Sequence, residues 1–408
     1  MDDTALTHSG TLPGGILPST APPGTPGPGW RWLRARAADS SLRMAGLLWL
    51  GSKIALVVLV WVITWIVQSA ERHPLRLGRI FERWDAAQFR VIAEYGYFGG
   101  PDRFKPDQVA FFPGYPLLLR GVHLLLHPWL ADELAIGTVA SFFAILGLVR
   151  LAQEYRAGSG VWAGVFLLAA PAAIFLAVGY SEALFLALAL PAWRAARRGA
   201  WPWAGLLAAG ACLVRINGLF VLAGLVIMAL QATRNAGATT SRRWSAIGAL
   251  SLALVPVAAY VVYLRDKTGD WLAWQHAEER GWRRNFGDPV TTLRNTWQVA
   301  FGHVFRTPLA FTFQLELLAV GVLLITVIVL FWQRQWPEAC YVALTTAALV
   351  VGHWYTSVPR ALLLVWPLWC GLARLAQRRP WVAGLWLAAS APLMFATAVL
   401  YLSGRWAG

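Results

Sequence analysis

The chain has 408 residues, of which 58% are hydrophobic and 13% are charged, and its mean hydropathy is +0.53. Soluble domains carry charge on about a quarter of their residues, so this composition excludes an ordinary soluble protein. The net charge of +15 would suit a nucleic-acid partner, but the basic residues are scattered between apolar runs and form no dense patch with interleaved aromatic residues. We therefore expect a membrane protein that binds no nucleic acid.

The chain begins with a segment, 1–45, that we predict to be a disordered Pro/Gly-rich tail followed by a basic cytoplasmic stretch. It has too few apolar residues to offset the entropy of ordering, and it lacks the order of a signal peptide. A transmembrane domain is expected over 46–402, with a short tail at 403–408.

Repeated apolar runs follow the tail, and many approach the roughly 20 residues that a helix needs to cross a bilayer. Backbone groups in lipid must be satisfied within the segment, so the predicted fold class is an all-α transmembrane bundle. The eleven expected crossings are roughly 46–69, 134–152, 160–178, 182–195, 202–214, 218–232, 245–264, 312–332, 337–352, 361–377 and 381–402.

Arginine positions predict the orientation of the bundle. With a cytoplasmic N-terminus, the short inner loops collect most arginines, as the positive-inside rule requires. Two long outer loops, 70–133 and 265–311, collect most acidic residues. Pro113 and Pro116 interrupt the apolar stretch 109–127, and a crossing there would invert every later loop. We therefore expect an interfacial or re-entrant helix at 109–127.

The most informative segment is 80–97, IFERWDAAQFRVIAEYGY, which predicts an amphipathic helix in the first outer loop. Asp85 falls on its apolar face, where a carboxylate costs desolvation energy unless it meets a partner or a wet cavity. Asp85 is therefore a candidate functional residue. The sequence leaves open an ion pair with Arg83 or Arg79 that only fixes the loop. The two faces consist of Arg83, Arg90 and Glu94, and of Phe81, Trp84, Gln88 and Ile92.

Two further segments mark the predicted outer surface. The stretch 109–119, VAFFPGYPLLL, includes Tyr115 and could line a groove for an isoprenoid chain, although aromatic residues and prolines are also common membrane anchors. Tyr180 and Glu182 lie in the block GYSEALF. Glu182 is the only acid between Glu154 and Asp266. An isolated intramembrane acid is typical of a functional site, but Glu182 could also sit at a helix N-terminus with Ser181 as its cap.

Polar residues also occur at two later outer turns, as Arg215 with Asn217 in LVRINGLF and as His353 with Arg360 in HWYTSVPRALLL. A guanidinium at the mouth of a low-dielectric cavity is suited to bind a phosphate. An ion pair with Asp85 or Glu182 is the alternative for Arg215. For Arg360 we favour phosphate.

Several motifs are absent from the sequence. The three cysteines are far apart inside apolar runs, and no spacing demands a metal, so we expect no cofactor and leave metal dependence open. There is no phosphate-binding glycine loop and no Asp-x-Asp pair of the kind that nucleotide-sugar enzymes use. Any activated donor must therefore arrive through the membrane.

Five blocks occur in a fixed order: RWDAAQFRVIAEYGY, AFFPGYPLLLR, GYSEALF, RINGL and SVPRALL. In this order and spacing the chain resembles, over about 46–402, the second mannosyltransferase of GPI-anchor synthesis (the PIG-V type) and its prokaryotic relatives, within the GT-C class of glycosyltransferases. The resemblance implies a GT-C bundle that transfers a sugar, typically mannose, from a polyprenyl phosphate with inversion, on the extracytoplasmic face of the cell membrane.

The resemblance also implies roles for the candidate residues. Asp85 would be the general base, and Arg360, with Arg215 or His353, would stabilise the departing lipid phosphate. Glu182 would position sugar hydroxyls or the acceptor. The other expected substrate-binding residues are Arg83, Trp84, Gln88, Tyr115, Tyr180 and Asn217.

The chain is compact for this family, and its arginine-rich composition suggests a bacterial source, where no GPI acceptor exists. The acceptor is therefore a glycan, a glycolipid or a protein. A transporter or lipid flippase is the alternative function. Such proteins often show inverted repeats, which the two halves of this chain do not share.

Overall fold

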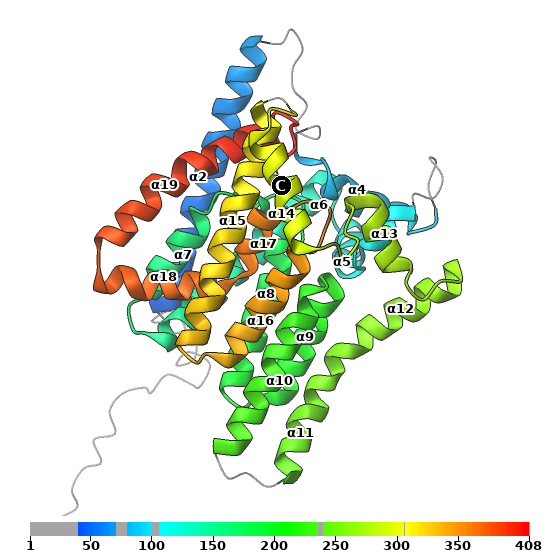
Figure 1. Ribbon diagram of the computed structural model, residues 1–408, viewed down its shortest axis with the longest axis vertical. Helices are drawn as coiled ribbons and strands as arrows, with labels where there is room; N and C mark the ends of the chain where they lie inside the picture. Colours follow the sequence, from blue (N-terminus) through cyan, green and yellow to red (C-terminus); the bar gives the residue numbers. More distant parts are fainter. Residues whose placement is uncertain (1–39, 71–79, 100–105, 236–239, 306, 408) are drawn as a thin grey trace, which may run out of the picture. The chain divides into compact units, whose positions relative to one another are not determined.

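The computed structural model describes residues 40–70, 80–99, 106–235, 240–305 and 307–407. The chain divides into Met1–Ser40 and Ser41–Gly408, and the account below concerns the second unit. Most of the predicted tail lies outside the described residues, so it stays a prediction. The described residues contain helices and no strand, which confirms the all-α prediction for this part of the chain (Figure 1).

The helices follow one another with short connections. Those in the first half are α2 (Ser40–Ala70), α4 (Asp85–Tyr95), η1 (Pro106–Ala110), α5 (Gly114–His123), α6 (Trp129–Tyr155), α7 (Gly160–Leu168), η2 (Ala173–Leu176), α8 (Glu182–Arg197) and α9 (Trp201–Val214). Those in the second half are α10 (Asn217–Asn235), α11 (Thr240–Ser251), η3 (Leu252–Leu254), α12 (Val255–Thr268), α13 (Ala273–Trp282), α14 (Pro289–Phe301), α15 (Thr307–Trp332), α16 (Trp336–Leu349), α17 (Val358–Leu364), α18 (Trp366–Arg378) and α19 (Trp381–Leu402).

The chain is a multi-pass membrane protein. Five helical stretches in the described residues are long and apolar enough to cross a membrane, and α17 with α18 makes a sixth if this bent pair counts as one span. The five are Ser40–Ile66, Trp129–Tyr155, Trp244–Thr268, Thr307–Trp332 and Trp381–Leu402. Each overlaps a predicted crossing. The remaining predicted crossings correspond to shorter helices, so the count of eleven stays a prediction.

Two predicted crossings are not continuous helices. The segment 160–178 is the nine-residue α7 followed by a turn and η2. Pro171 lies in this turn and cannot donate a backbone hydrogen bond. The segment 361–377 is broken after Leu364, and α17 and α18 bend by 71°. Pro367 lies in the first turn of α18, where its missing N–H costs little.

The first outer loop departs from prediction in one respect and agrees in another. The predicted helix over 80–97 is shorter: α4 begins at Asp85, because Trp84 has a φ of 55° that no helix continues through. Phe81 and Trp84 are therefore not on its face. In the stretch 109–127, α5 has only ten residues, about 15 Å by helical rise, or half the roughly 30 Å of a hydrocarbon core. This length supports the prediction that the stretch does not cross.

The bundle core contains an aromatic cluster from α8, α16 and α18. Trp193, Tyr341 and Trp366 are fully buried, with ring centroids 5.2 Å apart for Trp193 and Trp366 and 4.4 Å apart for Tyr341 and Trp366. The Tyr341 hydroxyl donates to the Leu364 carbonyl at 3.0 Å, which fixes the C-terminal end of α17. The core therefore holds the helix that carries Arg360.

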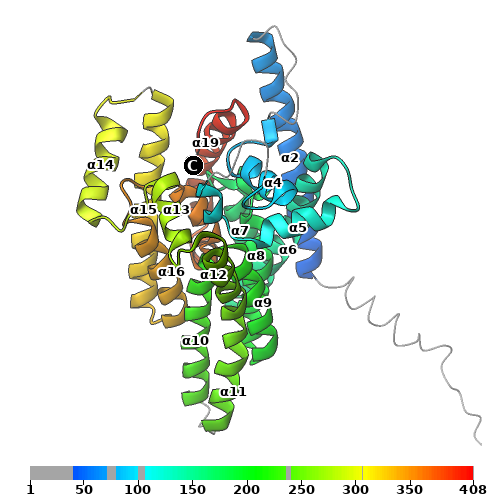
Figure 2. The same cartoon turned by 90° about the vertical axis from the view of Figure 1, so that its right-hand side faces the viewer.

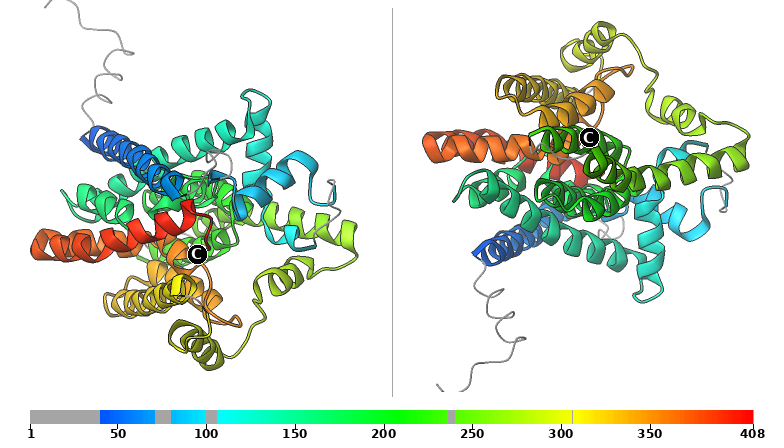
Figure 3. Two further views of the ribbon diagram at one scale, coloured as in Figure 1. Left: turned by 90° about the horizontal axis from the view of Figure 1, so that it is seen from above. Right: turned by 90° about the horizontal axis from the view of Figure 1, so that it is seen from below.

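Helices α9, α10 and α11 pack together at one end of the view, and α12 to α14 lie at the edge of the bundle (Figures 2 and 3). Small residues permit the close approach of α9 and α11. A Cβ atom at Gly205 would lie 1.9 Å from the carbonyl oxygen of Ala249. Only a residue without a side chain fits at this contact.

We predict that Gly205→Ala destabilises the protein by about 1–3 kcal/mol, the usual cost of overpacking a core. The matched control is Gly321→Ala on α15, where an added Cβ meets no atom within 4 Å. Thermal unfolding in detergent measures both variants. Equal melting temperatures for the two would contradict this account of the α9–α11 contact.

Candidate active site

One guanidinium joins two carboxylates from distant parts of the chain. Arg360 Nη2 donates to Asp85 Oδ2 at 2.7 Å and to Glu182 Oε1 at 2.8 Å, and its Nε donates to Glu182 Oε1 at 3.0 Å. The three side chains are 6%, 19% and 0% exposed, in the order Arg360, Asp85, Glu182. The structure therefore brings together three of the predicted site residues.

Helix termini explain why the acids lie here. Asp85 is the first residue of α4 and Glu182 the first of α8, where unpaired N–H groups favour a negative charge. Arg360 lies in the first turn of α17, where a positive charge is unfavourable without a partner. The two carboxylates supply that partner.

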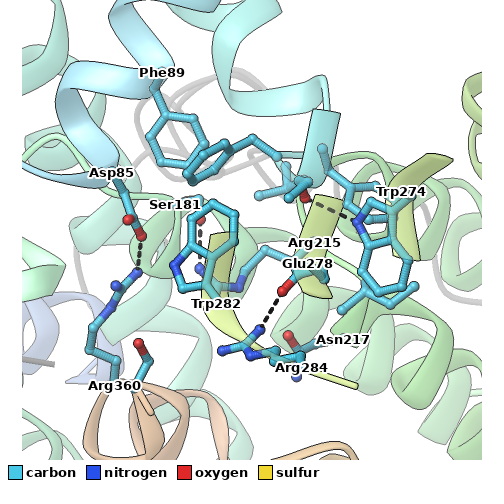
Figure 4. Close-up of a pocket in the computed structure, with 16 residues that line it drawn as sticks. Asp85, Phe89, Ser181, Arg215, Asn217, Trp274, Glu278, Trp282, Arg284 and Arg360 are labelled. Carbon is cyan, nitrogen blue, oxygen red and sulfur yellow. Dashed lines mark hydrogen bonds and ion pairs between the residues drawn. The ribbon is translucent and has the colours of Figure 1, made fainter. Parts of the chain in front are cut away.

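Arg215 extends the cluster from the break between α9 and α10. Its Nη1 donates to Ser181 Oγ at 2.7 Å and to Glu182 Oε1 at 3.1 Å (Figure 4). The ion pair that the sequence left open for Arg215 is therefore formed, with Glu182. The predicted Ser181 cap is wrong: this side chain makes no cap bond to α8, and its hydroxyl accepts from Arg215 instead.

Aromatic rings support the Arg360 guanidinium. The carbon at its centre lies 4.6 Å from the centroid of the Tyr180 ring and 4.9 Å from that of Phe175. Ring faces carry negative potential and stabilise a desolvated cation. Tyr180, a predicted substrate-binding residue, is buried and so acts beneath the arginine.

Asp85 pairs with a distant arginine, beyond the local partners considered from sequence. Arg83 donates to the Tyr401 carbonyl at 3.4 Å, and Arg79 lies outside the described residues. The Asp85 side chain is neither in open solvent nor sealed from it, since it is 19% exposed. A carboxylate that keeps some access and faces a cation can exchange protons with a bound molecule.

Two hollows meet at this cluster, and Asp85, Trp282, Ser357 and Arg360 line both. We call the first, of about 110 Å³, the polar hollow, and the second, of about 550 Å³, the aromatic hollow. The polar hollow is also lined by Phe89, Ala110, Phe111, Phe112, Ser181, Val214, Arg215, Ile216, Asn217, Trp274, Glu278 and Arg284. The aromatic hollow is also lined by Trp84, Gln88, Gly281, Arg283, Phe305, Leu309, Phe313, Trp354, Thr356 and Trp406.

Helix α13 of the second outer loop forms one wall of the polar hollow, and sequence reasoning missed it. Trp274, Glu278 and Trp282 are spaced by four residues, so they share a helix face. The Trp274 indole donates to the Ala110 carbonyl at 3.0 Å, which ties α13 to η1. The i, i+4, i+8 spacing of these residues in the loop is the signal that could have found this wall.

Glu278 is a second carboxylate in the polar hollow. It pairs with Arg284 at 3.1 Å (Figure 4). Burial raises the pKa of the Glu278 carboxyl, while the Arg284 charge acts in the opposite direction. The hollow therefore presents two acids with different surroundings, one beside Arg360 and one beside Arg284.

Arg283 brings a further positive charge to the aromatic hollow. Its guanidinium lies 5.2 Å from the Trp354 ring centroid, and no carboxylate of the described residues forms an ion pair with it. Its backbone has a φ of 54°, and its carbonyl accepts from the His353 N–H at 2.9 Å. The position of this cation is thus fixed by the adjoining backbone.

The remaining predicted residues differ in their relation to the hollows. Trp84 and Gln88 line the aromatic hollow, and Asn217 lines the polar one. Tyr115, His353 and Arg83 line neither. Tyr115 is fully buried and packs on Phe89 at a centroid distance of 4.7 Å, so we assign it to packing. Within the described ranges, no three His, Cys, Asp or Glu residues form a metal-binding group, and the metal requirement stays open.

Glu316 of α15 positions the helix that carries Arg360. Its two carboxylate oxygens accept the backbone N–H groups of Ser357 and Val358, each at 2.8 Å. Glu316 is fully buried, and Ser357 has a φ of 60°, a turn that most residues avoid. The carboxylate therefore fixes this turn and, with it, the start of α17.

Comparison with known proteins gives the site a family context. Residues 65–258 match the family model "Mannosyltransferase (PIG-V)". This match confirms the resemblance predicted from the sequence. It includes Asp85, Glu182 and Arg215, whereas Arg360 and α13 lie beyond it.

Curated relatives agree with this match. GPI alpha-1,6-mannosyltransferase 2 of Rattus norvegicus is 38% identical over 149 residues, which are 34% of this chain and 29% of the rat protein. The Homo sapiens protein is 34% identical over 148 residues, 33% of this chain and 29% of the relative. The matched stretch thus spans under a third of the length of these relatives.

One solved structure is also similar. It is the crystal structure of ArnT from Cupriavidus metallidurans bound to undecaprenyl phosphate, with a TM-score of 0.46 and 17% sequence identity, covering 83% of this chain and 62% of that chain.

We predict that Glu316→Gln lowers kcat/KM for mannosyl transfer by about tenfold or more, because an amide cannot accept both N–H groups and each tenfold is about 1.4 kcal/mol. If Glu316 acts through Arg360, then adding Glu316→Gln to Arg360→Lys causes little further loss. The matched control is Glu338→Gln, a buried acid on α16 that accepts from the Tyr155 hydroxyl at 2.5 Å. Additive losses in the double variant would show that Glu316 does not work through Arg360.

Proposed function

We propose that the chain is a membrane glycosyltransferase that moves a hexose, mannose by kinship with the matched relatives, from a polyprenyl-phosphate donor to an acceptor hydroxyl. The carrying observation is the Asp85–Arg360 pair at the junction of the two hollows. It sets a proton acceptor beside a cation suited to phosphate, in a chain built to meet lipid substrates.

We infer that the N-terminus is cytoplasmic and that the site faces the extracytoplasmic side of the cell membrane. Four predicted outer positions from separate segments support this topology, because Asp85, Glu182, Arg215 and Arg360 converge on one cluster. The arginine-rich inner loops of the positive-inside model are consistent with the same orientation.

The proposed reaction is a single displacement. Asp85 takes the proton of the acceptor hydroxyl as that oxygen forms a bond to the anomeric carbon, and the bond from this carbon to the phosphate oxygen breaks. The electron pair leaves with the polyprenyl phosphate, where Arg360 stabilises the charge. Attack opposite the leaving group inverts the anomeric configuration.

Charge balance indicates how the donor phosphate would be held. Arg360 and Arg215 are matched by Asp85 and Glu182, so this cluster of four is neutral. Arg283 adds an uncompensated positive charge in the aromatic hollow, whose apolar walls suit the first isoprene units. We therefore place the lipid phosphate between Arg283 and Arg360.

The polar hollow would then hold sugar. Asn217 and Glu278 line it, and Arg215 forms part of the same wall. Such groups bind vicinal hydroxyls, and the indole rings of Trp274 and Trp282 offer apolar faces for ring carbons. The acceptor, whether a glycan, a glycolipid or a protein, brings its hydroxyl to this hollow.

We predict that Asp85→Asn lowers the rate of transfer by about 10²-fold or more, the usual contribution of a general base. The assay supplies radiolabelled polyprenyl-phosphate mannose together with membranes of the source cell as acceptor, and separates products by polarity. Glu94→Gln is the matched control, because this acid lies on the same helix and pairs with Arg90.

Full activity in Asp85→Asn, with an unchanged melting temperature, would rule out this base. Movement of label across a sealed vesicle without any new glycosylated product would instead establish a transporter or flippase.

A second prediction concerns Arg283. Arg283→Gln should raise KM for the polyprenyl-phosphate donor by about tenfold, since a charge-assisted contact contributes about 1.5–3 kcal/mol, with a smaller change in KM for the acceptor. Arg294→Gln on α14, an exposed arginine that lines neither hollow, should match the wild type. An unchanged donor KM in Arg283→Gln would place the phosphate elsewhere.

A further inference from the structure

Helices α15 and α18 leave a groove between them, away from the candidate active site. The groove has a volume of about 530 Å³. Apolar side chains of both helices line most of it, including Ile325 and Leu330 on α15 and Leu368 and Leu372 on α18. Polar groups gather where these two helices end, and the set consists of Gln333, Arg374 and Arg378. An apolar groove with a cationic end has the polarity of a lipid turned around.

The two arginines of the groove are not neutralised by protein. Arg374 donates to the Gln333 side chain at 3.4 Å and lies 5.6 Å from the Tyr155 ring centroid. No carboxylate among the described residues lies within 4.0 Å of Arg374 or Arg378, and none lines the groove.

Nearby arginines show that such pairing is available elsewhere. Glu154 binds Arg194 at 2.8 Å, Arg197 at 3.7 Å and Arg198 at 2.7 Å. The chain thus supplies an acid to one group of loop arginines and none to the pair in the groove. An anion from outside the protein completes this pair.

The length of the groove matches one leaflet. From Ile325 to Gln333 the α15 wall rises about 12 Å at the helical rise of about 1.5 Å per residue. One leaflet contributes about 15 Å of the roughly 30 Å hydrocarbon core. A chain lying along the groove would therefore place its headgroup at the arginine end.

We propose that this groove binds an anionic glycerophospholipid, with one acyl chain along the apolar wall and the phosphate between Arg374 and Arg378. Two guanidinium groups can share the phosphate oxygens through charge-assisted hydrogen bonds. The bound lipid would join α15 to α18, which pack around it. This lipid is distinct from the donor, whose site lies in the aromatic hollow.

Two variants test the site by different means. Arg374→Gln with Arg378→Gln removes the cations and leaves the apolar wall. Gly371→Leu leaves the cations and fills the groove, because an added Cβ at Gly371, which lines the groove, meets no atom within 4 Å. The control is Arg379→Gln, an exposed arginine next in sequence that does not line the groove.

The measurement is thermal unfolding of the full chain in phosphatidylcholine nanodiscs titrated with phosphatidylglycerol. Ligand that binds only the folded state raises the melting temperature by mass action. We expect this rise in the wild type and in Arg379→Gln, and an apparent affinity weakened about tenfold or more in the other two variants.

Three outcomes would overturn the site. They are no rise in the wild type, a full rise in both groove variants, and an equal rise with water-soluble glycerophosphoglycerol, which lacks the acyl chains. None of these outcomes depends on glycosyl transfer, so the lipid site can fail while the proposed function stands.

Discussion

The bidentate hold of two carboxylates on Arg360 is the interaction on which the site depends. Taking a guanidinium and two carboxylates out of water costs several kcal/mol for each ion, and only good geometry offsets that cost. The fold supplies the geometry at both ends of α17, through Glu316 at its start and Tyr341 at its end. Loss of either carboxylate would leave a buried charge without a full partner.

The same pairing constrains the order of events in the proposed reaction. While Arg360 holds Asp85 at 2.7 Å, this carboxylate is a poor base, because its negative charge is already stabilised. A donor phosphate that takes over the Arg360 hydrogen bonds would release Asp85. The base would therefore become active only once the donor is bound, which favours donor binding before proton transfer from the acceptor.

The sequence predicted the composition of the site better than its geometry. Asp85, Glu182, Arg215 and Arg360 could be found because isolated charges among apolar residues are costly and therefore informative. Their mutual pairing could not be derived, since 275 residues separate Asp85 from Arg360 and only the packed bundle brings them together. Helix α13 was overlooked because it lies in a polar loop, where Trp and Glu residues carry no such cost.

Backbone breaks were equally hard to predict, and they explain why charges can lie in this bundle. Trp84 has a φ of 55°, Ser357 one of 60°, and α9 ends at Val214 before Arg215. Irregular backbone inside a membrane protein is tolerated where it lines a cavity, because polar side chains there satisfy the freed groups. Glu316 does this at Ser357. Each break thus exposes a helix end toward the hollows, and the charged side chains at those ends become the chemical groups of the site.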